Sequence, residues 1–279
     1  KSSVAICTIV RDCAHRLEKN VPEIEKLRAC FQGSIVIAIE NDSIDGTKDV
    51  LANWKKEAAG VTVLSNDCGI DTIIETENDA DVSFSDHRMD RMAFHRNQYM
   101  NELEDKKGID YVIVVDLDLQ DISIAGIANT FGQPNVWHAV AANGLYHCTF
   151  SKFFNGYKYY DTYAFCETGD ERPRTKEIIF ENQTLLRHLR PGMLMMPVSS
   201  AFGGLAVYDY QALMSARYTA LANDDSEVGA YCEHIALHHE MIDKGFDKIF
   251  INPSMVVVYE TYFEHFVKLI RKHTGLAKH

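Results

Sequence analysis

The sequence lacks the features that mark membrane-spanning chains and chains built on metal clusters or disulfides. No uninterrupted apolar run reaches the roughly 18 residues that a membrane helix needs, so we expect no transmembrane segment in this chain. Its seven cysteines are odd in number and include no CxxC pair, which argues against a zinc cluster or a full set of disulfides. We therefore expect free, buried thiols.

Positive charge is also scarce. The chain has 28 Lys and Arg against 40 Asp and Glu, a formal net charge of -12. Proteins that coat nucleic acid need clustered cations to neutralise phosphates, so we expect no nucleic-acid partner. We expect a protein that works in the cytoplasm or at a membrane surface. A catalytic domain of the secretory lumen is the alternative if the chain is part of a longer protein.

Short apolar runs alternate with amphipathic segments along the chain. Residues 4–10, 34–39, 61–64 and 111–115 predict buried strands, and residues 17–27, 50–54 and 88–103 have helical spacing. This alternation predicts an α/β fold, with a mostly parallel central sheet flanked by helices. We expect the chemistry at the carboxyl ends of the strands.

An acidic pair directly follows the run 111–115. Asp116 and Asp118 stand where a strand gives way to a turn, so both carboxylates can converge on one cation. Hard cations such as Mn²⁺ and Mg²⁺ prefer oxygen ligands and commonly bridge substrate phosphates. Two aspartates that only cap a turn are the alternative.

A second acidic turn, residues 40–47, ends the run 34–39. The carboxylates of Glu40, Asp42 and Asp45 can accept hydrogen bonds from a base or from ribose hydroxyls, as the acidic residue of dinucleotide folds does. Ser43 or Asp45 could instead cap the next helix. The two roles are compatible.

Three arginines lie on the helix expected at 88–103. Arg88, Arg91 and, less directly, Arg96 could share one face, and guanidinium groups suit pyrophosphate because they bind it through two hydrogen bonds. A solvated basic face is the alternative.

The segment 231–241 contains two glutamates and three histidines. Glu233 is a candidate base at the start of a helix, and a carboxylate that only favours the helix dipole is the alternative. His234 and His238 share a helix face, which can form a metal pair. The His-Glu-x-x-His order of zinc proteases is absent, however. We expect His238 and His239 to be ordinary helix-surface residues.

Taken in order, these segments resemble the GT-A glycosyltransferases. Residues 35–47 resemble that family's nucleotide-binding strand and turn, and Asp116-Leu117-Asp118 matches its D-x-D motif. Residues 200–208 look like its Gly-Gly segment beside the donor sugar, and residues 232–259 are similar to its acidic helix and following strand. The R-x-x-R-M-A-x-x-R-N pattern at 88–97 resembles in particular the fungal capsule-associated mannosyltransferases.

The resemblance implies a GT-A, Rossmann-like fold and transfer of a hexose from a nucleoside diphosphate sugar to a hydroxyl of a glycan or glycoconjugate. It implies one domain over 1–279, with a nucleotide-binding half at 1–118, an acceptor and catalytic half at 119–265 and a tail at 266–279. The implied site residues are Glu233 or His234 as base; Glu40, Asp42, Asp45, Arg88, Arg91, Arg96, Asp116, Gly203 and Gly204 for the donor; and Asp116, Asp118 and His265 for Mn²⁺ or Mg²⁺.

Two departures from the family pattern leave roles open. The usual acidic pair is here Glu233-His234, so either residue could be the base. Tyr259 replaces the histidine that often ends the last strand as a metal ligand, and Glu260, His265 or water would have to serve. A non-catalytic nucleotide-sugar or glycan-binding module of the same fold is an alternative function. A nucleotidyltransferase is another, although residues 4–16 contain no glycine-rich phosphate loop.

Overall fold

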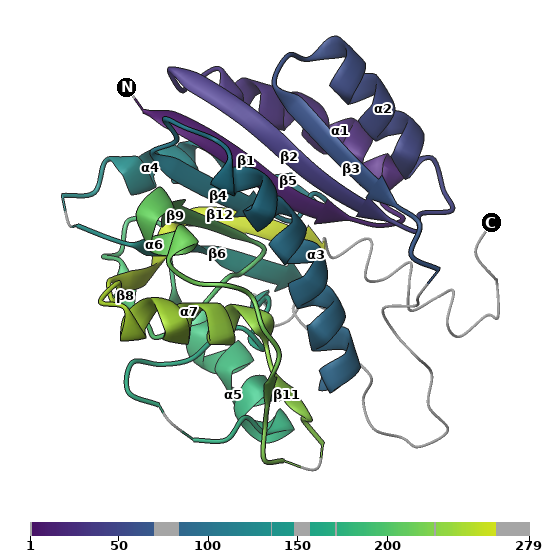
Figure 1. Ribbon diagram of the computed structural model, residues 1–279. Coiled ribbons are helices and arrows are strands. Elements are labelled where there is room, and N and C mark those ends of the chain that lie inside the picture. The colour runs from purple at the N-terminus through teal and green to yellow at the C-terminus, as the bar shows by residue number, and fades with distance from the viewer. Residues whose placement is uncertain are drawn as a thin grey trace.

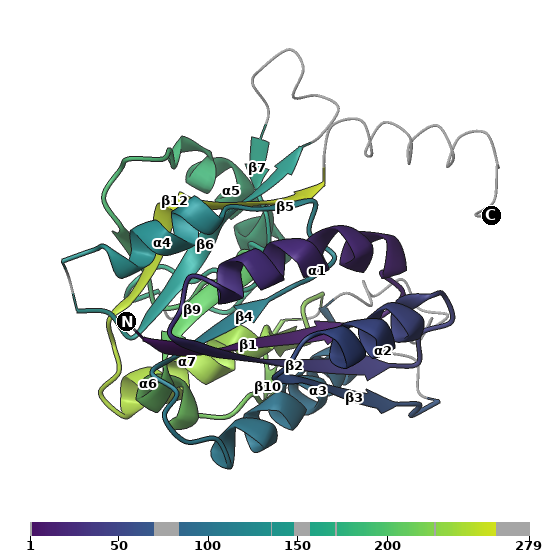
Figure 2. The same ribbon diagram turned by 90° about the horizontal axis from the view of Figure 1, so that it is seen from above.

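A sheet of ten strands organises the chain, with helices against both of its faces (Figures 1 and 2). The computed structural model describes residues 2–69, 84–134, 136–147, 157–170, 172–225 and 227–260. The strands of the large sheet are β1 (Ser3–Val10), β2 (Gly33–Asn41), β3 (Val61–Asn66), β4 (Tyr111–Val115), β5 (Asp121–Ile122), β6 (Ala139–His147), β7 (Tyr157–Tyr159), β8 (Met196–Pro197), β9 (Leu205–Asp209) and β12 (Ile249–Glu260). The pair β10 (Leu221–Ala222) and β11 (Ala230–Tyr231) forms a separate small sheet.

The large sheet is mixed, but its long strands share one direction. Its order is β3-β2-β1-β4-β9-β6-β12-β5, with β7 beside β6 and β8 beside β12. The pairs β3–β2, β2–β1, β1–β4 and β6–β12 are parallel. Strand β9 runs antiparallel to both of its neighbours, β4 and β6. The predicted α/β fold with a mostly parallel sheet flanked by helices is therefore confirmed, and its division into halves at residue 118 stays a prediction.

The helices predicted at 17–27, 50–54 and 88–103 and the helix that begins at Glu233 are all present, and three others were not predicted. The helices are α1 (Ala14–Arg28), α2 (Thr47–Glu57), α3 (Asp86–Glu104), α4 (Ile124–Phe131), α5 (Lys176–Leu185), α6 (Tyr210–Met214) and α7 (Glu233–Asp243), with a 3-10 turn at Leu186–His188. Helix α3 begins where the hydroxyl of Ser85 accepts a hydrogen bond from the N–H of Arg88, 3.3 Å away. None of the helices within the described residues combines the length and apolar character that a bilayer span requires.

Two cores, one on each face, explain why the strand runs are apolar without alternation. In β1, Ala5 and Cys7 join the core beneath α3 and α7, whereas Val4 and Ile6 join the core beneath α1, α2 and α4. Successive strand side chains point to opposite faces, so a strand covered on both sides is apolar at every position.

The cysteines are free, as expected, wherever the structure describes them. Cys7, Cys13, Cys166 and Cys232 are buried thiols, and Cys30 and Cys68 are also free. The expectation of a buried thiol was wrong for Cys30, which is exposed just after the end of α1. Cys148 lies outside the described residues.

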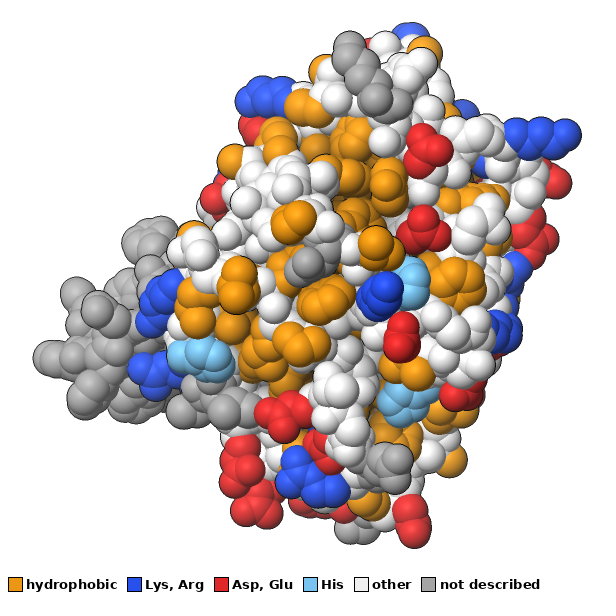
Figure 3. Space-filling model, turned by 90° about the vertical axis from the view of Figure 1, so that its left-hand side faces the viewer, with side chains coloured by type: hydrophobic (Ala, Val, Ile, Leu, Met, Phe, Trp, Pro, Cys, Tyr) orange, Lys and Arg blue, Asp and Glu red, His pale blue; other side chains and the backbone are white. Residues whose placement is uncertain are grey.

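Apolar side chains gather on the face that carries α4 and β8 (Figure 3). Leu194, which precedes β8, is 90% exposed, and Val136, which follows α4, is 66% exposed. A small pocket of about 240 Å³ lies between α1 and α4, against Phe31 and Phe131. It lies at the amino ends of the parallel strands, away from the predicted site.

Candidate active site

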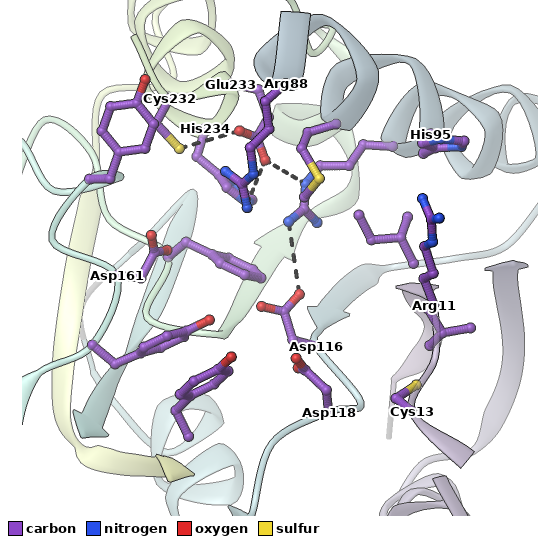
Figure 4. Close-up of a pocket in the computed structure, with 18 of the residues that line it drawn as sticks. Arg11, Cys13, Arg88, His95, Asp116, Asp118, Asp161, Cys232, Glu233 and His234 are labelled. Atoms are coloured by element: carbon purple, nitrogen blue, oxygen red, sulfur yellow. Dashed lines mark hydrogen bonds and ion pairs between the residues drawn. The ribbon is translucent and has the colours of Figure 1, made fainter. Parts of the chain in front are cut away.

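The carboxyl ends of β1, β2 and β4 border a cavity of about 490 Å³ (Figure 4). Helix α3, the start of α7 and the turn after β7 form its other sides. Of the predicted site residues, it brings together Arg88, Arg96, Asp116, Asp118, Glu233 and His234. Residues far apart in the sequence thus meet at the edge of the sheet where parallel strands place a ligand.

The turn after β4 presents two carboxylates to this cavity. Asp116 and Asp118 line it, while the intervening Leu117 and the following Leu119 are buried in the core. Because the apolar side chains alternate with the acids, burial of the leucines turns both acids toward the same side. Figure 4 shows the two aspartates one above the other.

Hydrogen bonds from two other segments hold the backbone of this turn. The N–H of Asp116 donates to the carbonyl oxygen of Gly204 at 2.9 Å. From α1, the buried amide of Asn20 donates to the carbonyl oxygens of Leu117 at 2.9 Å and Leu119 at 2.7 Å. No pattern in the sequence predicts this role of Asn20, because an asparagine inside a helix is unremarkable until its partner is known.

Arg96 connects α3 to both acidic parts of the site. Its Nε donates to Oε1 of Glu233 at 2.8 Å, and its Nη2 lies 3.8 Å from Oδ1 of Asp116. The guanidinium also lies over the ring of Phe202, 5.0 Å from its centroid, and over that of Tyr218, at 5.6 Å. This buried cation therefore has a charge partner on either side and aromatic faces around it.

Glu233 and His234 begin α7 at the top of the cavity in Figure 4. Glu233 is buried, and its second oxygen lies 3.4 Å from the thiol sulfur of Cys232. The His234 ring stacks on Phe202 with centroids 4.0 Å apart. Burial, with a contribution from nearby Arg96, lowers the pKa of His234 well below its usual value, so the ring is neutral.

Asp161 is a site residue that sequence reasoning missed. It follows β7 in a left-handed conformation with φ of 62°, which few residues other than glycine adopt. Its carboxylate accepts a hydrogen bond from the N–H of Gly203, and burial together with Glu233 raises its pKa to about 7. Asp161 comes from an aromatic stretch without clear periodicity, so no local pattern marked it.

Among the described residues, the carboxylates of the site outnumber the cations that pair with them. Burial raises the pKa of Asp116 well above its usual value, and Asp118, Asp161 and Glu233 raise it further, whereas Arg96 lowers it. A cation beside the aspartate pair would relieve this repulsion.

The aspartate pair fits a hard divalent metal. No group of three or more Asp, Glu, His or Cys side chains within the described residues is arranged to hold a metal ion. Mg²⁺, however, is commonly bound by one or two carboxylates and completes its shell with water and substrate phosphates. Asp116 and Asp118 supply such a pair, and the predicted ligand His265 lies outside the described residues.

Glu40 lies at the end of β2, beside the cavity but not on its wall. It is fully buried, and its carboxylate accepts hydrogen bonds from the N–H of Ser43 at 2.8 Å and from the hydroxyl of Ser65. In this structure Glu40 therefore shapes the turn 40–47. Its contact with a donor stays a prediction.

The other two acids of that turn have different surroundings. Asp45 accepts from the N–H groups of Ala14 and Thr47, at 3.0 Å and 2.9 Å, so it joins the starts of α1 and α2 as the capping alternative expected. Asp42 borders a neighbouring pocket of about 370 Å³ with Lys48. A role for either acid in donor binding also stays a prediction.

Arg91, Gly203 and Gly204 lie around the cavity and not on its wall. The guanidinium of Arg91 lies over the exposed ring of Phe94, 5.9 Å from its centroid. The two glycines have φ of 66° and 88°, and a Cβ at Gly203 would come within 2.5 Å of the carbonyl oxygen of Ala142. The Gly-Gly turn thus approaches the sheet closely and offers its backbone to Asp116 and Asp161.

His238 differs from the expectation of a helix-surface residue, which was wrong. It is fully buried, and its ring nitrogens lie 2.8 Å from the hydroxyl of Ser200 and 3.1 Å from that of Tyr208. Helix α7 packs against the sheet on this side, and the two hydroxyls satisfy the ring. His239 is only partly buried.

The chain is similar in sequence to one protein family and also resembles several solved structures. The profile of the family described as Cryptococcal mannosyltransferase 1 matches residues 4–240. None of the curated proteins matches the chain. Similar solved structures include the mannosyltransferase PcManGT from Pyrobaculum calidifontis in complex with GDP-Man and Mn²⁺, with 17% identity and a TM-score of 0.48; the match covers 96% of this chain and 64% of that one. Another is glucosyl-3-phosphoglycerate synthase from Mycobacterium tuberculosis, with 14% identity and a TM-score of 0.46, over 99% of this chain and 81% of that one.

This chain therefore spans less than two thirds of the Pyrobaculum enzyme. The family match, by contrast, extends over most of the sequence and includes the D-x-D turn, the arginine helix and the start of α7. The chain belongs to the Cryptococcal mannosyltransferase 1 family.

Proposed function

We propose that the protein transfers mannose from a nucleoside diphosphate mannose to a hydroxyl of a glycan or glycoconjugate, with Mn²⁺ or Mg²⁺ as cofactor. The family match supports the sugar and the class of reaction. The observation that carries the proposal is the convergence of Arg96, Asp116 and Glu233 in one cavity, with Asp118 beside them.

The donor diphosphate would bind where the aspartates and arginines meet. Asp116 and Asp118 would hold the divalent cation, which when bound would neutralise the charge of the departing diphosphate. Arg88 and Arg96 line the same cavity, and the Nη1 group of Arg96 has no hydrogen-bond partner among the described residues. A buried donor of this kind suits a phosphate oxygen.

Glu233 is the proposed base on the acceptor side. It would take the proton of the acceptor hydroxyl while that oxygen forms a bond to the anomeric carbon and the bond from that carbon to the diphosphate oxygen breaks. The nucleoside diphosphate leaves. This role belongs to an inverting reaction; in a retaining one Glu233 would orient the acceptor. Proton NMR of the new anomeric centre distinguishes the two.

Donor binding tests the proposal first. A ligand that binds only the folded state at 100 times its dissociation constant stabilises that state by about 2.7 kcal/mol. We expect GDP-mannose or another nucleoside diphosphate mannose to raise the melting temperature with Mn²⁺ present, and not in EDTA. No shift with any nucleoside diphosphate sugar would contradict the proposal. Donor binding without transfer to any glycan or to water would indicate a non-catalytic binding module.

Asp118→Ala should abolish transfer and the Mn²⁺-dependent shift, because it removes one of the two carboxylates of the pair. The fold should survive, since Asp118 is exposed at the end of a turn. Asp121→Ala is the matched control, as Asp121 is an exposed acid three residues further on. Near-normal turnover by Asp118→Ala, or full activity of the wild type in EDTA, would disprove the metal role.

A further inference from the structure

A second cavity adjoins the first and has a different character. Its volume is about 400 Å³, within the range of roughly 300–1,000 Å³ typical of small-molecule sites. Residues from the ends of β6, β7 and β12 line it together with residues of α5. Its aromatic side chains, which we call the aromatic groove, are Phe84, Tyr146, Tyr159, Tyr160, Tyr163, Phe180 and Tyr259.

The aromatic groove is continuous with the active-site cavity. Tyr160, Asp161, Tyr163 and Tyr259 line both. Asp161 lies on the opposite side of the active-site cavity from Arg11, with Asp116 between them (Figure 4). A molecule bound in the groove would therefore approach the D-x-D turn from the side away from the end of β1.

The groove combines an exposed aromatic ring, Phe180, with polar groups. Phe180 is 51% exposed on α5, although a large apolar side chain gains stability by burial. Lys158 and Gln183 add hydrogen-bonding groups at the same site. Apolar faces beside a few polar groups match a sugar ring, which has C–H groups on its faces and hydroxyls at its edge.

Asp161 is held in a fixed position where the aromatic groove meets the active-site cavity, which we call the junction. Its backbone occupies a sparsely populated conformation, with φ of 62°, and strain of this kind is concentrated at functional sites. The N–H of Gly203 orients its carboxylate. Nothing in the proposed donor site requires Asp161 to lie here, whereas an acceptor hydroxyl that enters from the groove would meet this carboxylate first.

We infer that the aromatic groove binds the acceptor as a carbohydrate chain, and that Asp161 accepts a hydrogen bond from the hydroxyl of the sugar that enters the active-site cavity. The inference rests on the proposed function. It adds the residues that would hold an acceptor of at least two sugars. One sugar occupies the junction, and the next lies against Phe180.

Chain-length dependence tests the inference. With Mn²⁺ and GDP-mannose, wild-type kcat/KM should rise about tenfold from mannose to mannobiose, a step equivalent to about 1.4 kcal/mol. In Phe180→Ala this gain should vanish, because the KM for mannobiose should rise. Leu194→Ala, which removes a side chain that is 90% exposed on another face, is the matched control and should keep the gain. Asp161→Asn should lower transfer to both acceptors, since asparagine tolerates the left-handed backbone but carries no charge.

Saturation-transfer NMR provides a readout that does not depend on turnover. Manno- and gluco-oligosaccharides of two to four residues are added to the wild-type protein with Mn²⁺ and GDP, and at least one should bind, more weakly to Phe180→Ala. The inference is overturned if none binds, or if Phe180→Ala binds and uses each of them as the wild type does. Donor-induced thermal stabilisation would persist in that case, so failure of the groove can be told from failure of the proposed function.

Discussion

Two adjacent side chains at the start of α7 compete for the role of base. Glu233→Gln keeps the shape and an oxygen that can accept from Arg96, so donor binding should persist. The rate at saturating donor should fall by about 10²–10⁴, the usual contribution of positioned proton transfer. His234→Ala should have a smaller effect on the rate, since this ring packs on Phe202. Single-turnover rates decide: a nearly normal Glu233→Gln with an inactive His234→Ala would reverse the assignment.

Glu40 tests whether a residue predicted for ligand binding also stabilises the fold. Glu40→Ala should weaken donor binding more than it slows the chemical step, because a contact with base or ribose is present in ground and transition states alike. It should also lower the free energy of unfolding by about 1–3 kcal/mol, since the buried N–H of Ser43 loses its acceptor, as does the hydroxyl of Ser65. Urea unfolding and donor titration measure the two effects, with exposed Glu57→Ala as control. Unchanged stability would contradict the buried role.

Sequence reasoning found the site residues that have a local signature and missed those that do not. Asp116 was found because it ends an apolar strand, and Arg96 and Glu233 because they lie in recognisable helical segments. Asp161 and Asn20 act through backbone groups more than 40 and nearly 100 residues away in the chain, respectively. Such contacts exist only once the sheet order is set, so no spacing in the sequence predicts them.

At the scale of elements, α1 holds the backbone of the D-x-D turn through the side chain of Asn20. Asn20→Leu removes both amide hydrogen bonds and leaves two buried carbonyl oxygens without their donor, a loss of about 1–3 kcal/mol in stability. The turn should also lose its fixed position, so Mn²⁺-dependent donor binding should weaken although Asn20 touches no ligand. Calorimetric titration of the donor measures this. Glu23→Ala, on the exposed side of α1, is the control, and an Asn20→Leu protein that binds the donor normally would refute the positioning role.

The strands predicted from sequence belong to the parallel part of the sheet, where β1, β2 and β4 are largely buried and the edge strand β3 is partly exposed. Residues 4–10, 34–39, 61–64 and 111–115 all form strands, because their β-branched runs suit a parallel sheet covered by helices. Strand β6 gave a weaker signal, since its sequence, Ala-Val-Ala-Ala-Asn-Gly, is rich in small residues. A Cβ at Gly144 would come within 2.6 Å of the carbonyl oxygen of Gly203. Close packing around the Gly-Gly turn thus removed the pattern on which strand prediction depends.

At the scale of the whole molecule, buried histidine makes stability depend on pH. Burial lowers the pKa of His238 from 6.5 to about 3, so between these values the unfolded chain binds a proton that the folded protein does not. The stability that neutral His238 provides is therefore present above pH 6.5 and is lost as the pH falls toward 3. The loss is about 1.4 kcal/mol per pH unit.

A comparison with His238→Gln isolates this effect. Asp161 acts in the opposite direction, because its raised pKa favours protonation in the folded state. The stability of the wild type minus that of His238→Gln should therefore shrink by about 2 kcal/mol between pH 7.5 and pH 5. Urea unfolding at both values measures it. A difference that stays constant with pH would mean that His238 takes up its proton over the same pH range in the folded protein as in the unfolded chain.

Strand β9 has a mechanical consequence for the enzyme. Within the large sheet β9 lies between β4 and β6 and pairs with both. It therefore joins the strands that lead to the D-x-D turn to the strands around β12. Sliding one side past the other would break at least one of these two hydrogen-bond ladders. The sheet therefore holds the D-x-D turn and the end of β6 at a fixed separation, which the proposed reaction would use to keep donor and acceptor in register.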